Sequence, residues 1–150
     1  MNRAALHKIG YGVYIVTSGH NGKFNGQIAN SIIQATSKPA TLAICINKEN
    51  YTHELITASR KFTVNILSEA APMTLIGLFG FKSGREVDKL KDTKTKAGST
   101  GIPVILDHTL GYIEAEVEGL VFGGDIEHIR PSGDDVGRAV RIDDALGRDM

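Results

Sequence analysis

The sequence predicts a mostly β domain, in which a sheet closes on itself or forms a sandwich and a few short helices complete the fold. Several segments have the β-branched or alternating pattern of strands, and few have the period of a helix. Strands and helices do not alternate along the chain, which disfavours a parallel sheet built from βαβ units. The 150 residues fit one domain, and a chain of this length buries roughly two thirds of its unfolded surface.

The beginning of the chain is predicted to run from a short helix into strands. Asn2 can cap a helix that Gly10 ends, because asparagine accepts bonds from the first helical N–H groups. Pro39 argues against a helix just before it, so the segment ahead of it is interpreted as a bent strand. The predicted elements are a helix at Arg3–Ile9, a strand at Tyr11–Ser18, a hairpin connection at Gly19–Gly26 and a bent strand at Gln27–Ser37.

The middle of the chain predicts two strands and two helices. The first strand is a continuous apolar run, which is typical of burial on both faces, whereas the second alternates like a half-buried strand. Leu55 and Ile56 are expected to face inward from the first helix, and Pro72 suits the first turn of the second. The elements are a strand at Thr41–Asn47, helical turns at Thr52–Ala58, a strand at Lys61–Leu67 and a helix at Pro72–Phe79.

The last third divides into a long loop, one clear strand and a polar tail. Phe81–Gly101 is charged and weakly periodic, so it predicts a loop long enough to be functional. Ile113–Phe122 alternates apolar and acidic residues like a strand. We expect one domain over residues 1–124. Asp125–Met150, with seven acidic and four basic residues and no strand-like alternation, docks on it or is partly disordered, with a possible short helix at Ala139–Leu146.

Composition excludes several classes of function. The chain has 17 basic and 17 acidic residues, so no net field attracts nucleic acid or an anionic membrane, and a neutral chain mildly favours an oligomer. No apolar run approaches the ~20 residues that span a bilayer, and the start of the chain has no signal-peptide pattern. A single cysteine, Cys45, fits a reducing compartment. The expectation is a cytoplasmic protein.

Searches for catalytic and metal motifs find little. The chain has no dinucleotide-binding glycine pattern, no P-loop and no nucleophile elbow. Cys45 stands in an apolar run, where a cysteine behaves as a small inert hydrophobe. Five histidines share no ligand spacing, which favours surface or structural roles over metal binding: His7, His20, His53, His108 and His128. The sequence therefore predicts no catalytic side chain and no metal site.

Two polar segments suit a flat ring that carries a phosphate. Asn25–Ser31 combines small and amide residues, whose backbone and side chains can approach a planar heteroaromatic ring closely. Asn47–His53 follows a buried strand and opens a helix, so its side chains and the helix N-terminus can hold a phosphate. Polar loops after strands are common, so on these residues alone other readings stay open.

These segments also carry a family resemblance. The stretches FNGQIANS, SKPATLAICINKENYTHELI, FTVNILSE, GLFGFKSGREVDK and LDHTLGYIEAEV resemble the flavin reductase-like family with an FMN-binding split β-barrel. The nearest branch is the flavin reductase domain of high-molecular-weight rubredoxins, close to the flavoredoxins. The similarity runs from about Ala4 to Val121. It implies a homodimeric, Greek-key split barrel that binds FMN without covalent attachment and takes electrons from NADH or NADPH.

The resemblance also assigns the residues of the flavin site. The loop matching Phe81–Lys89, which includes Ser83, lies beside the flavin in the family, and Thr36 and Ser37 can add ring contacts. A flavin carries its own chemistry, which explains why the motif search finds no catalytic side chain. The ring is implied to contact Gln27, Ile28, Ala29, Asn30 and Ser31, and the phosphate Asn47, Lys48, Asn50, Thr52 and His53.

One departure from the family pattern falls at the end of the chain. Arg130-Pro131-Ser132 stands where relatives have an apolar strand, and proline removes a ladder donor. His128 stands near the place of a family histidine beside the flavin, but the residues around it differ from the family pattern, so that role is not carried over. The expected function is an NAD(P)H-dependent flavin reductase or a flavoredoxin-like carrier that passes electrons to a separate rubredoxin-like partner. The alternative is a flavin-binding module without turnover.

Overall fold

The computed structural model describes residues 8–38, 40–118 and 140–142, and most of the regular secondary structure in this part of the chain is strand. Two helices accompany the strands, α1 (Tyr51–Ser59) and α2 (Met73–Phe81). The strands are β1 (Tyr14–His20), β2 (Lys23–Ala29), β3 (Ile32–Ser37), β4 (Ala40–Ile44), β5 (Lys61–Leu67), β6 (Thr95–Ala97), β7 (Pro103–Ile105), β8 (Thr109–Glu116) and β9 (Val140–Ile142). The predicted mostly β class is confirmed.

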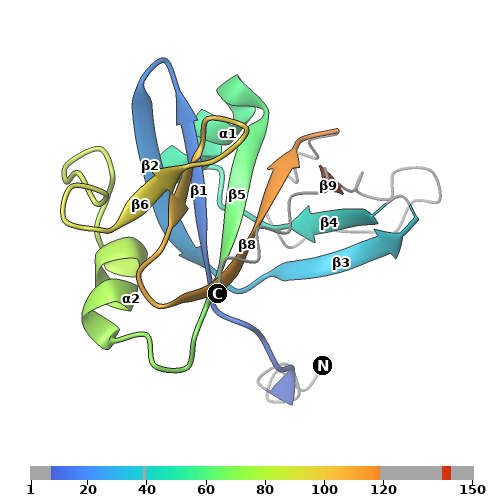
Figure 1. Ribbon diagram of the computed structural model, residues 1–150, viewed down its shortest axis with the longest axis horizontal. Helices are drawn as coiled ribbons and strands as arrows, with labels where there is room; N and C mark the ends of the chain where they lie inside the picture. Colours follow the sequence, from blue (N-terminus) through green and yellow to red (C-terminus); the bar gives the residue numbers. More distant parts are fainter. Residues whose placement is uncertain (1–7, 39, 119–139, 143–150) are drawn as a thin grey trace.

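Seven strands form one antiparallel sheet, whose order forces it to curl (Figure 1). The order is β2-β1-β5-β8-β9-β4-β3, so β2 and β3 stand at opposite edges of the sheet. Only Asn30 and Ser31 separate these two strands, and three Cα–Cα steps reach about 11 Å at most. One end of each edge strand therefore meets the other, and the amide of Cys45 reaches the carbonyl oxygen of Ser31 at 3.0 Å. The sheet is curled but not closed, as in a split barrel.

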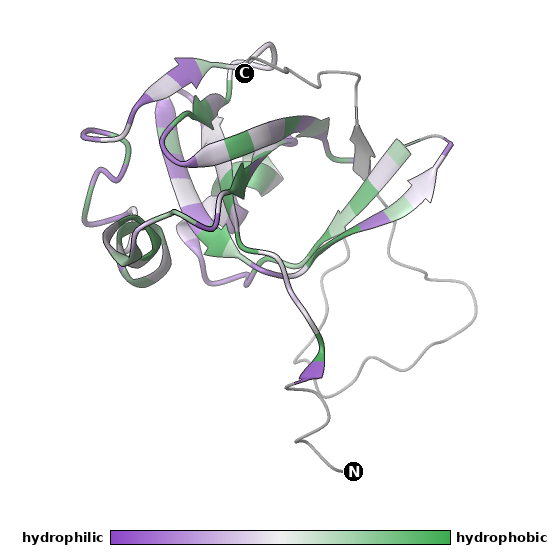
Figure 2. Cartoon of the chain, turned by 60° about the horizontal axis from the view of Figure 1, so that its bottom comes forward, coloured by the Kyte–Doolittle hydropathy of each residue, from purple (hydrophilic) through white to green (hydrophobic). Residues whose placement is uncertain are grey.

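The β3–β4 hairpin extends away from the rest of the sheet (Figures 1 and 2). Every residue of β3 after Ile32 is exposed, and Ile33 exposes 66% of its surface. The hairpin meets the sheet again through β9, which pairs with β4 on one side and β8 on the other.

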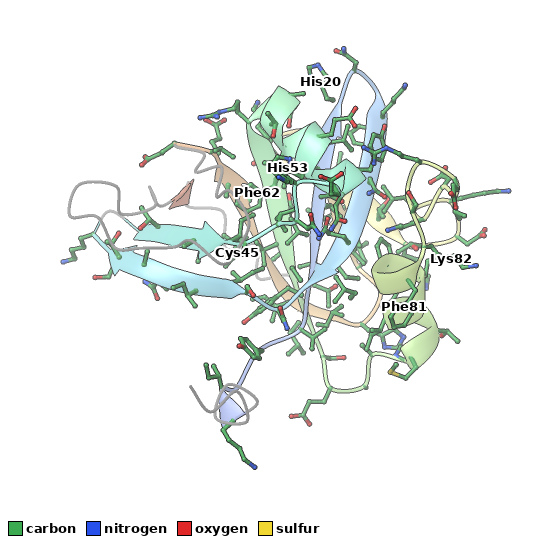
Figure 3. The ribbon with its side chains drawn as sticks, turned by 180° about the vertical axis from the view of Figure 1, so that it is seen from behind. His20, Cys45, His53, Phe62, Phe81 and Lys82 are labelled. Atoms are coloured by element: carbon green, nitrogen blue, oxygen red, sulfur yellow. The ribbon has the colours of Figure 1, made fainter. Side chains whose placement is uncertain are left out.

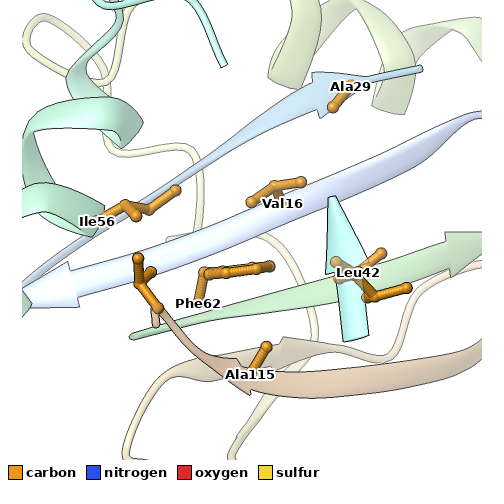
Figure 4. Packing of buried hydrophobic residues seen from close by; sticks show 8 residues of the cluster. Val16, Ala29, Leu42, Ile56, Phe62 and Ala115 are labelled. Carbon is orange, nitrogen blue, oxygen red and sulfur yellow. The ribbon is translucent and has the colours of Figure 1, made fainter. Parts of the chain in front are cut away.

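Two apolar cores lie on opposite faces of β1. Val16 belongs to the larger core with residues of β2, β4, β5, β8 and α1 (Figure 4), whereas its neighbour Ile15 packs with Phe79 and Ile105. Successive side chains of a strand point to opposite faces, so β1 is covered on both. The helices follow the same division, because α1 contributes Ile56 to the larger core and α2 contributes Phe79 to the smaller one.

A buried amide ties the small β6–β7 sheet to the main sheet. Asn65 on β5 is fully buried, and its Nδ2 donates to the carbonyl oxygen of Ile15 at 2.9 Å. Its Oδ1 accepts from the amide of Ile105 at 2.8 Å. Thr17 adds a second link, because its hydroxyl donates to the carbonyl oxygen of Pro103 at 2.6 Å. Polar groups of β1, β5 and β7 are thus satisfied inside the protein rather than by water.

A buried carboxylate clamps the turn between β6 and β7. Glu114 on β8 is 3% exposed and accepts bonds from the amide and hydroxyl of Thr100, each at 3.0 Å, and from the hydroxyl of Ser99 at 2.9 Å. Burial acts to raise the pKa of Glu114, but the hydrogen bonds from Thr100 and Ser99 outweigh it and lower the pKa below its ordinary value. The ionised carboxylate is the form that holds the turn.

We expect the Glu114→Gln variant to be less stable at neutral pH by about 1–3 kcal/mol, because bonds to a charged acceptor are the stronger ones. A lowered folded pKa means that this stabilisation is present above the unfolded pKa of about 4.5 and is lost as the pH falls through the folded pKa. Urea unfolding at pH 7, 5 and 3.5 measures the difference, which should shrink with acid. Glu116→Gln, an exposed neighbour on the same strand, is the control; equal losses in both variants would contradict the clamp.

Several predicted elements are confirmed. The strand at Lys61–Leu67 is β5 with the same ends, and both helices form close to their predicted positions. Leu55 and Ile56 are each 4% exposed, as expected for the inward face of α1. Pro72 stands one residue before α2 in extended backbone, so it precedes the first turn.

The first half of the chain also requires corrections. The predicted connection at Gly19–Gly26 is mostly strand, because the turn itself is only Asn21-Gly22, where both residues have positive φ. Such a two-residue turn suits the twist of a hairpin and favours Asn-Gly. The predicted bent strand breaks into β2 and β3 at Asn30-Ser31. β5 is buried at four successive positions and is not half-buried.

The strand predicted at Thr41–Asn47 ends at Ile44 and is buried only at Thr41 and Leu42. Cys45 is exposed, so it does not behave as a buried hydrophobe.

Corrections also fall on the C-terminal half. The predicted loop at Phe81–Gly101 contains β6 and buries Lys89 and Thr93. The strand predicted at Ile113–Phe122 begins earlier, at Thr109, and the structure describes it only to Glu116. In the tail, residues 140–142 form a strand, so the helix predicted at Ala139–Leu146 is wrong at these positions. His128 and the departure at Arg130-Pro131-Ser132 lie outside the described residues. The predicted helix at Arg3–Ile9 also lies outside them except for its last two residues.

Candidate functional site

The two polar segments singled out in the sequence meet at the start of α1. The side-chain amide of Asn25 on β2 donates to the hydroxyl of Thr52 on α1 at 2.9 Å, and both residues are buried, at 3% and 0% exposure. Further along, the Ser31–Cys45 backbone bond joins the other end of the first segment to the chain that leads into the second. The fold thus brings the predicted ring segment and the predicted phosphate segment together at two points.

A third segment, the loop over residues 82–89, lies against the same place. A Cβ atom added at Gly84 would stand 2.1 Å from Oδ1 of Asn25, so the loop backbone packs directly on that amide. The guanidinium of Arg85 binds the Glu54 carboxylate at 2.8 Å and stands 5.0 Å from the centre of the Tyr51 ring. The loop is therefore held to both β2 and the first turn of α1.

The far end of this loop also returns to β2. Lys89 is 4% exposed, and its Nζ donates to the carbonyl oxygen of Gly26 at 2.9 Å and to that of Phe79 at 3.3 Å. Burial lowers the pKa of Lys89 to about 8, from an ordinary value of 10.5. Because that pKa still lies above 7, Lys89 is protonated and positively charged in most molecules at neutral pH.

The two faces of β2 have different neighbours. Asn25 bonds to α1, whereas Gly26 faces the Phe79 ring of α2, whose atoms an added Cβ would approach to 3.0 Å. Ile28 lies on the α2 side as well, because its side chain is the neighbour of Gly80. The alternation of a strand places Gln27 on the α1 side with Asn25. Its Oε1 is buried and has no hydrogen-bond partner among the described residues, and buried polar atoms rarely lack one.

The start of α1 can receive an anion. Asn50 stands at the cap position in extended backbone and makes no side-chain cap bond, so its amide side chain leaves the N–H groups at the very start of the helix to other acceptors. Lys48 and Asn47 are exposed just before it, and His53 is half-buried in the first turn. Arg85 neutralises Glu54, the acidic residue of that turn, which would otherwise repel a phosphate.

A family model for the "flavin reductase like domain" matches residues 6–134. These residues make up most of the chain and include all three converging segments. The chain belongs to the flavin reductase-like family.

Individual relatives agree with this family. The chain is 47% identical over 124 residues to the high molecular weight rubredoxin of Moorella thermoacetica, covering 83% of this chain and 54% of that protein. It is 46% identical over 117 residues to the ferric-chelate reductase (NAD(P)H) of Archaeoglobus fulgidus, covering 78% and 69%. The chain thus spans about half the length of the first relative. Among solved structures, nitrilotriacetate monooxygenase component B of Mycobacterium thermoresistibile superposes with a TM-score of 0.72 at 30% identity, covering 82% and 66%.

The predicted site residues of this flavin reductase-like chain are not all presented alike. Gln27 is half-buried and Asn30 exposed, whereas Ile28 turns its side chain toward α2 and offers only its backbone to the other face. Thr52 is fully buried, so in this arrangement it links α1 to β2 and offers no open surface. The Ser83 hydroxyl is exposed and accepts a bond from the amide of Arg85 at 3.2 Å.

Residues that the sequence did not single out complete the arrangement. Gly84, Arg85 and Lys89 stand in the loop that was expected to lie beside the flavin, but none was predicted to bind β2 or α1. Figure 3 shows His53 at the start of α1 and Phe81 and Lys82 at the end of α2, and both helices contact β2. Glycine and basic residues in a polar loop carry no local signal of such contacts.

The part of the chain that the structure describes contains no group of three metal-binding side chains, and none of its helices is long and apolar enough to cross a membrane. A shallow hollow of about 370 Å³ lies at the other end of the β1–β2 hairpin, beside His20, Ser59 and Thr100. None of the predicted flavin residues lines it, so it does not bear on the flavin site.

Proposed function

We propose that this chain binds FMN non-covalently between β2, the start of α1 and the loop over residues 82–89, and that it works as an NAD(P)H-dependent flavin oxidoreductase. The observation that carries the proposal is the convergence of these three segments in a chain of the flavin reductase-like family. The ferric-chelate reductase relative is named for NAD(P)H, which supports a nicotinamide donor.

The ring fits the edge of β2. β2 is the outer strand of the sheet, so alternate peptide groups along it point away from β1 and are open to a ligand. The partnerless Oε1 of Gln27 is an acceptor that the N–H group of a flavin ring can satisfy. We assign ring contacts to the stretch from Gln27 to Ser31 on this basis, with the outward backbone groups serving at Ile28.

The phosphate fits the start of α1. Lys48 and Asn47 supply exposed donors, Asn50 and His53 flank the first turn, and the positive end of the α1 dipole favours an anion there. Thr52 supports this assembly from behind through its bond to Asn25. The donor set is that of a phosphate site and contains no acid or base placed for proton transfer.

When bound, FMN supplies the hydride and electron chemistry itself. The residues of the chain orient it: β2 holds one edge of the ring, α1 holds the phosphate, and the loop covers the side toward α2. Phe81, just before this loop, and Lys82 and Ser83 at its start are exposed, and a nicotinamide or an electron acceptor can approach there. No side chain is assigned a catalytic role.

The proposal also covers the partners and the location of the protein. We propose a homodimer, an electron acceptor of the rubredoxin type, and a cytoplasmic location, which suits the exposed thiol of Cys45. The relationship to a high molecular weight rubredoxin supports the acceptor.

Anaerobic reduction tests the activity. The flavin-loaded protein is mixed with NADH and, separately, with NADPH, and the visible flavin absorbance is followed. Bleaching by one of them at a rate above that of free FMN is expected. If neither donor bleaches the flavin but a reduced rubredoxin does, the protein is an electron carrier. A bound flavin that no donor reduces would contradict turnover and leave the non-catalytic flavin-binding module.

The Lys48→Ala variant should separate the phosphate end of the site from the ring end. We expect FMN to bind about tenfold more weakly and riboflavin to bind almost unchanged, because only FMN presents a phosphate to the ammonium group. Fluorescence titration with both ligands measures this. Lys23→Ala, at the far end of β2, is the control, and equal losses for the two ligands would refute the assignment of Lys48.

A further inference from the structure

Lys89 is a buried cation for which the proposed flavin chemistry has no use. It is 4% exposed, and its two hydrogen-bond partners are main-chain carbonyl oxygens rather than carboxylates. Its Nζ also lies 6.0 Å from the centre of the Phe79 ring. Lysine is almost never fully buried without a charged partner, and burial of its ammonium group is costly.

Each of the two carbonyl groups has a position that explains its need for a donor. Phe79 lies in the last turn of α2, where carbonyl groups have no helical partner and the helix dipole favours a cation. Gly26 lies on the outer strand β2, within the segment assigned to the flavin ring. One ammonium group thus joins the end of α2 to the ring segment.

The contact also determines what lies on the edge of β2. The peptide groups of a strand alternate in direction, so the peptide of Ile28 points the same way as the Gly26 carbonyl. Lys89 therefore occupies the edge position one repeat before the backbone assigned to the ring. Arg85 anchors the other part of the same loop to α1, so the loop is fastened at both ends of the site.

We propose that Lys89 is a positioning residue of the flavin site: its ammonium group holds the edge of β2 in place and sets a positive charge behind the flavin ring. This inference rests on the proposed function. A neutral donor could satisfy two carbonyl groups at lower cost, whereas a charge in a dry interior acts strongly over short distances. Reduced FMN has more negative charge than oxidised FMN, so the cation stabilises the reduced form more.

Flavin affinity and midpoint potential test this in the flavin-loaded protein. The Lys89→Met variant should bind FMN and riboflavin about tenfold more weakly, to an equal degree, because the ring segment and not the phosphate is disturbed. Reduced flavin should lose about tenfold more affinity than oxidised flavin. For a two-electron couple this lowers the midpoint potential by about 30 mV. Lys89→Arg, which keeps the charge, should restore most of the potential.

Lys91→Met is the matched control, because Lys91 is an exposed lysine only two residues after Lys89. If Lys89→Met does not fold, Lys89→Gln keeps a donor, removes the charge and should lower the potential with a smaller loss of affinity. A folded, saturated Lys89 variant with the potential and both affinities of the wild type would overturn the inference, whatever its melting temperature. A wild-type protein that binds no flavin would instead overturn the proposed function, and this inference with it.

Discussion

Replacing Gly84 with alanine is expected to weaken FMN binding by about tenfold or more and to destabilise the fold by about 1–3 kcal/mol. The new Cβ would stand 2.1 Å from Oδ1, 2.3 Å from Cγ and 2.7 Å from Nδ2 of Asn25. Asn25 has no room to withdraw, because it is 3% exposed and bonded to Thr52. Either the Asn25–Thr52 bond breaks or the loop moves off β2, and both outcomes separate segments that the flavin needs together.

Gly77→Ala is a closely matched control. An alanine Cβ there meets only the Phe81 ring, at an ordinary 3.7 Å, and a glycine in a helix gains stability on replacement by alanine. Neither glycine has a positive φ, so backbone strain does not confuse the comparison. Fluorescence titration with FMN and urea unfolding on both variants give the answer. Unchanged FMN affinity in Gly84→Ala would show that the loop is not a wall of the site.

The second large effect is expected at Asn65, remote from the flavin. The Asn65→Ala variant should lose about 3–5 kcal/mol of unfolding free energy, because it removes the buried side-chain hydrogen bonds to Ile15, Thr17 and Ile105 and leaves a cavity. That is a large share of the 5–15 kcal/mol typical of a domain. The β6–β7 sheet should loosen first, because the hydrogen bond from the Ile105 amide to Asn65 is one of its links to the main sheet.

Asn65→Asp should not rescue the variant, because a carboxylate keeps the acceptor for Ile105 but cannot donate to Ile15 and adds a buried charge. Gln34→Ala, which removes an exposed amide from β3, serves as the control and should change stability by less than about 0.5 kcal/mol. Urea midpoints and slopes measure the loss of stability, and amide hydrogen exchange at Val104, Ile105 and their neighbours measures the loosening of the β6–β7 sheet. A loss below about 1 kcal/mol in Asn65→Ala would contradict the role of the buried network.

The fold was predictable from sequence where local pattern and tertiary packing agree. Lys61–Leu67 is rich in β-branched and aromatic residues and lies between polar boundaries, so its ends coincide with those of β5. Asn-Gly is the strongest short signal for a hairpin turn, and the pair Asn21-Gly22 by itself indicates where the turn lies. β6 and β9 have three residues each, and segments this short become strands only through partners distant in sequence.

The site was predictable in part for a similar reason. Its two main segments have unusual local composition, and the family resemblance supplied their roles. The bond between Asn25 and Thr52, the close packing of Gly84 and the burial of Lys89 are products of the assembled fold. A lysine in a charged stretch is ordinarily solvated, so no local rule distinguishes Lys89 from the exposed Lys91.

The structure also explains why the site needs three separate pieces of chain. The curl of the sheet brings β2 next to the start of β3, and the connection after β4 returns past Ser31 to α1. The loop after α2 then closes against both through Arg85 and Lys89. Phosphate and ring are therefore held by different elements, which is why a Lys48 variant should weaken the binding of FMN alone, whereas a Lys89 variant should weaken FMN and riboflavin equally.

The visible absorbance spectrum of the purified protein, after incubation with excess FMN and removal of free ligand, tests the central claim most directly. Binding at the converging segments predicts flavin bands near one FMN per chain in the wild type, and clearly less in Gly84→Ala. A folded, colourless wild-type protein that retains no FMN would contradict it.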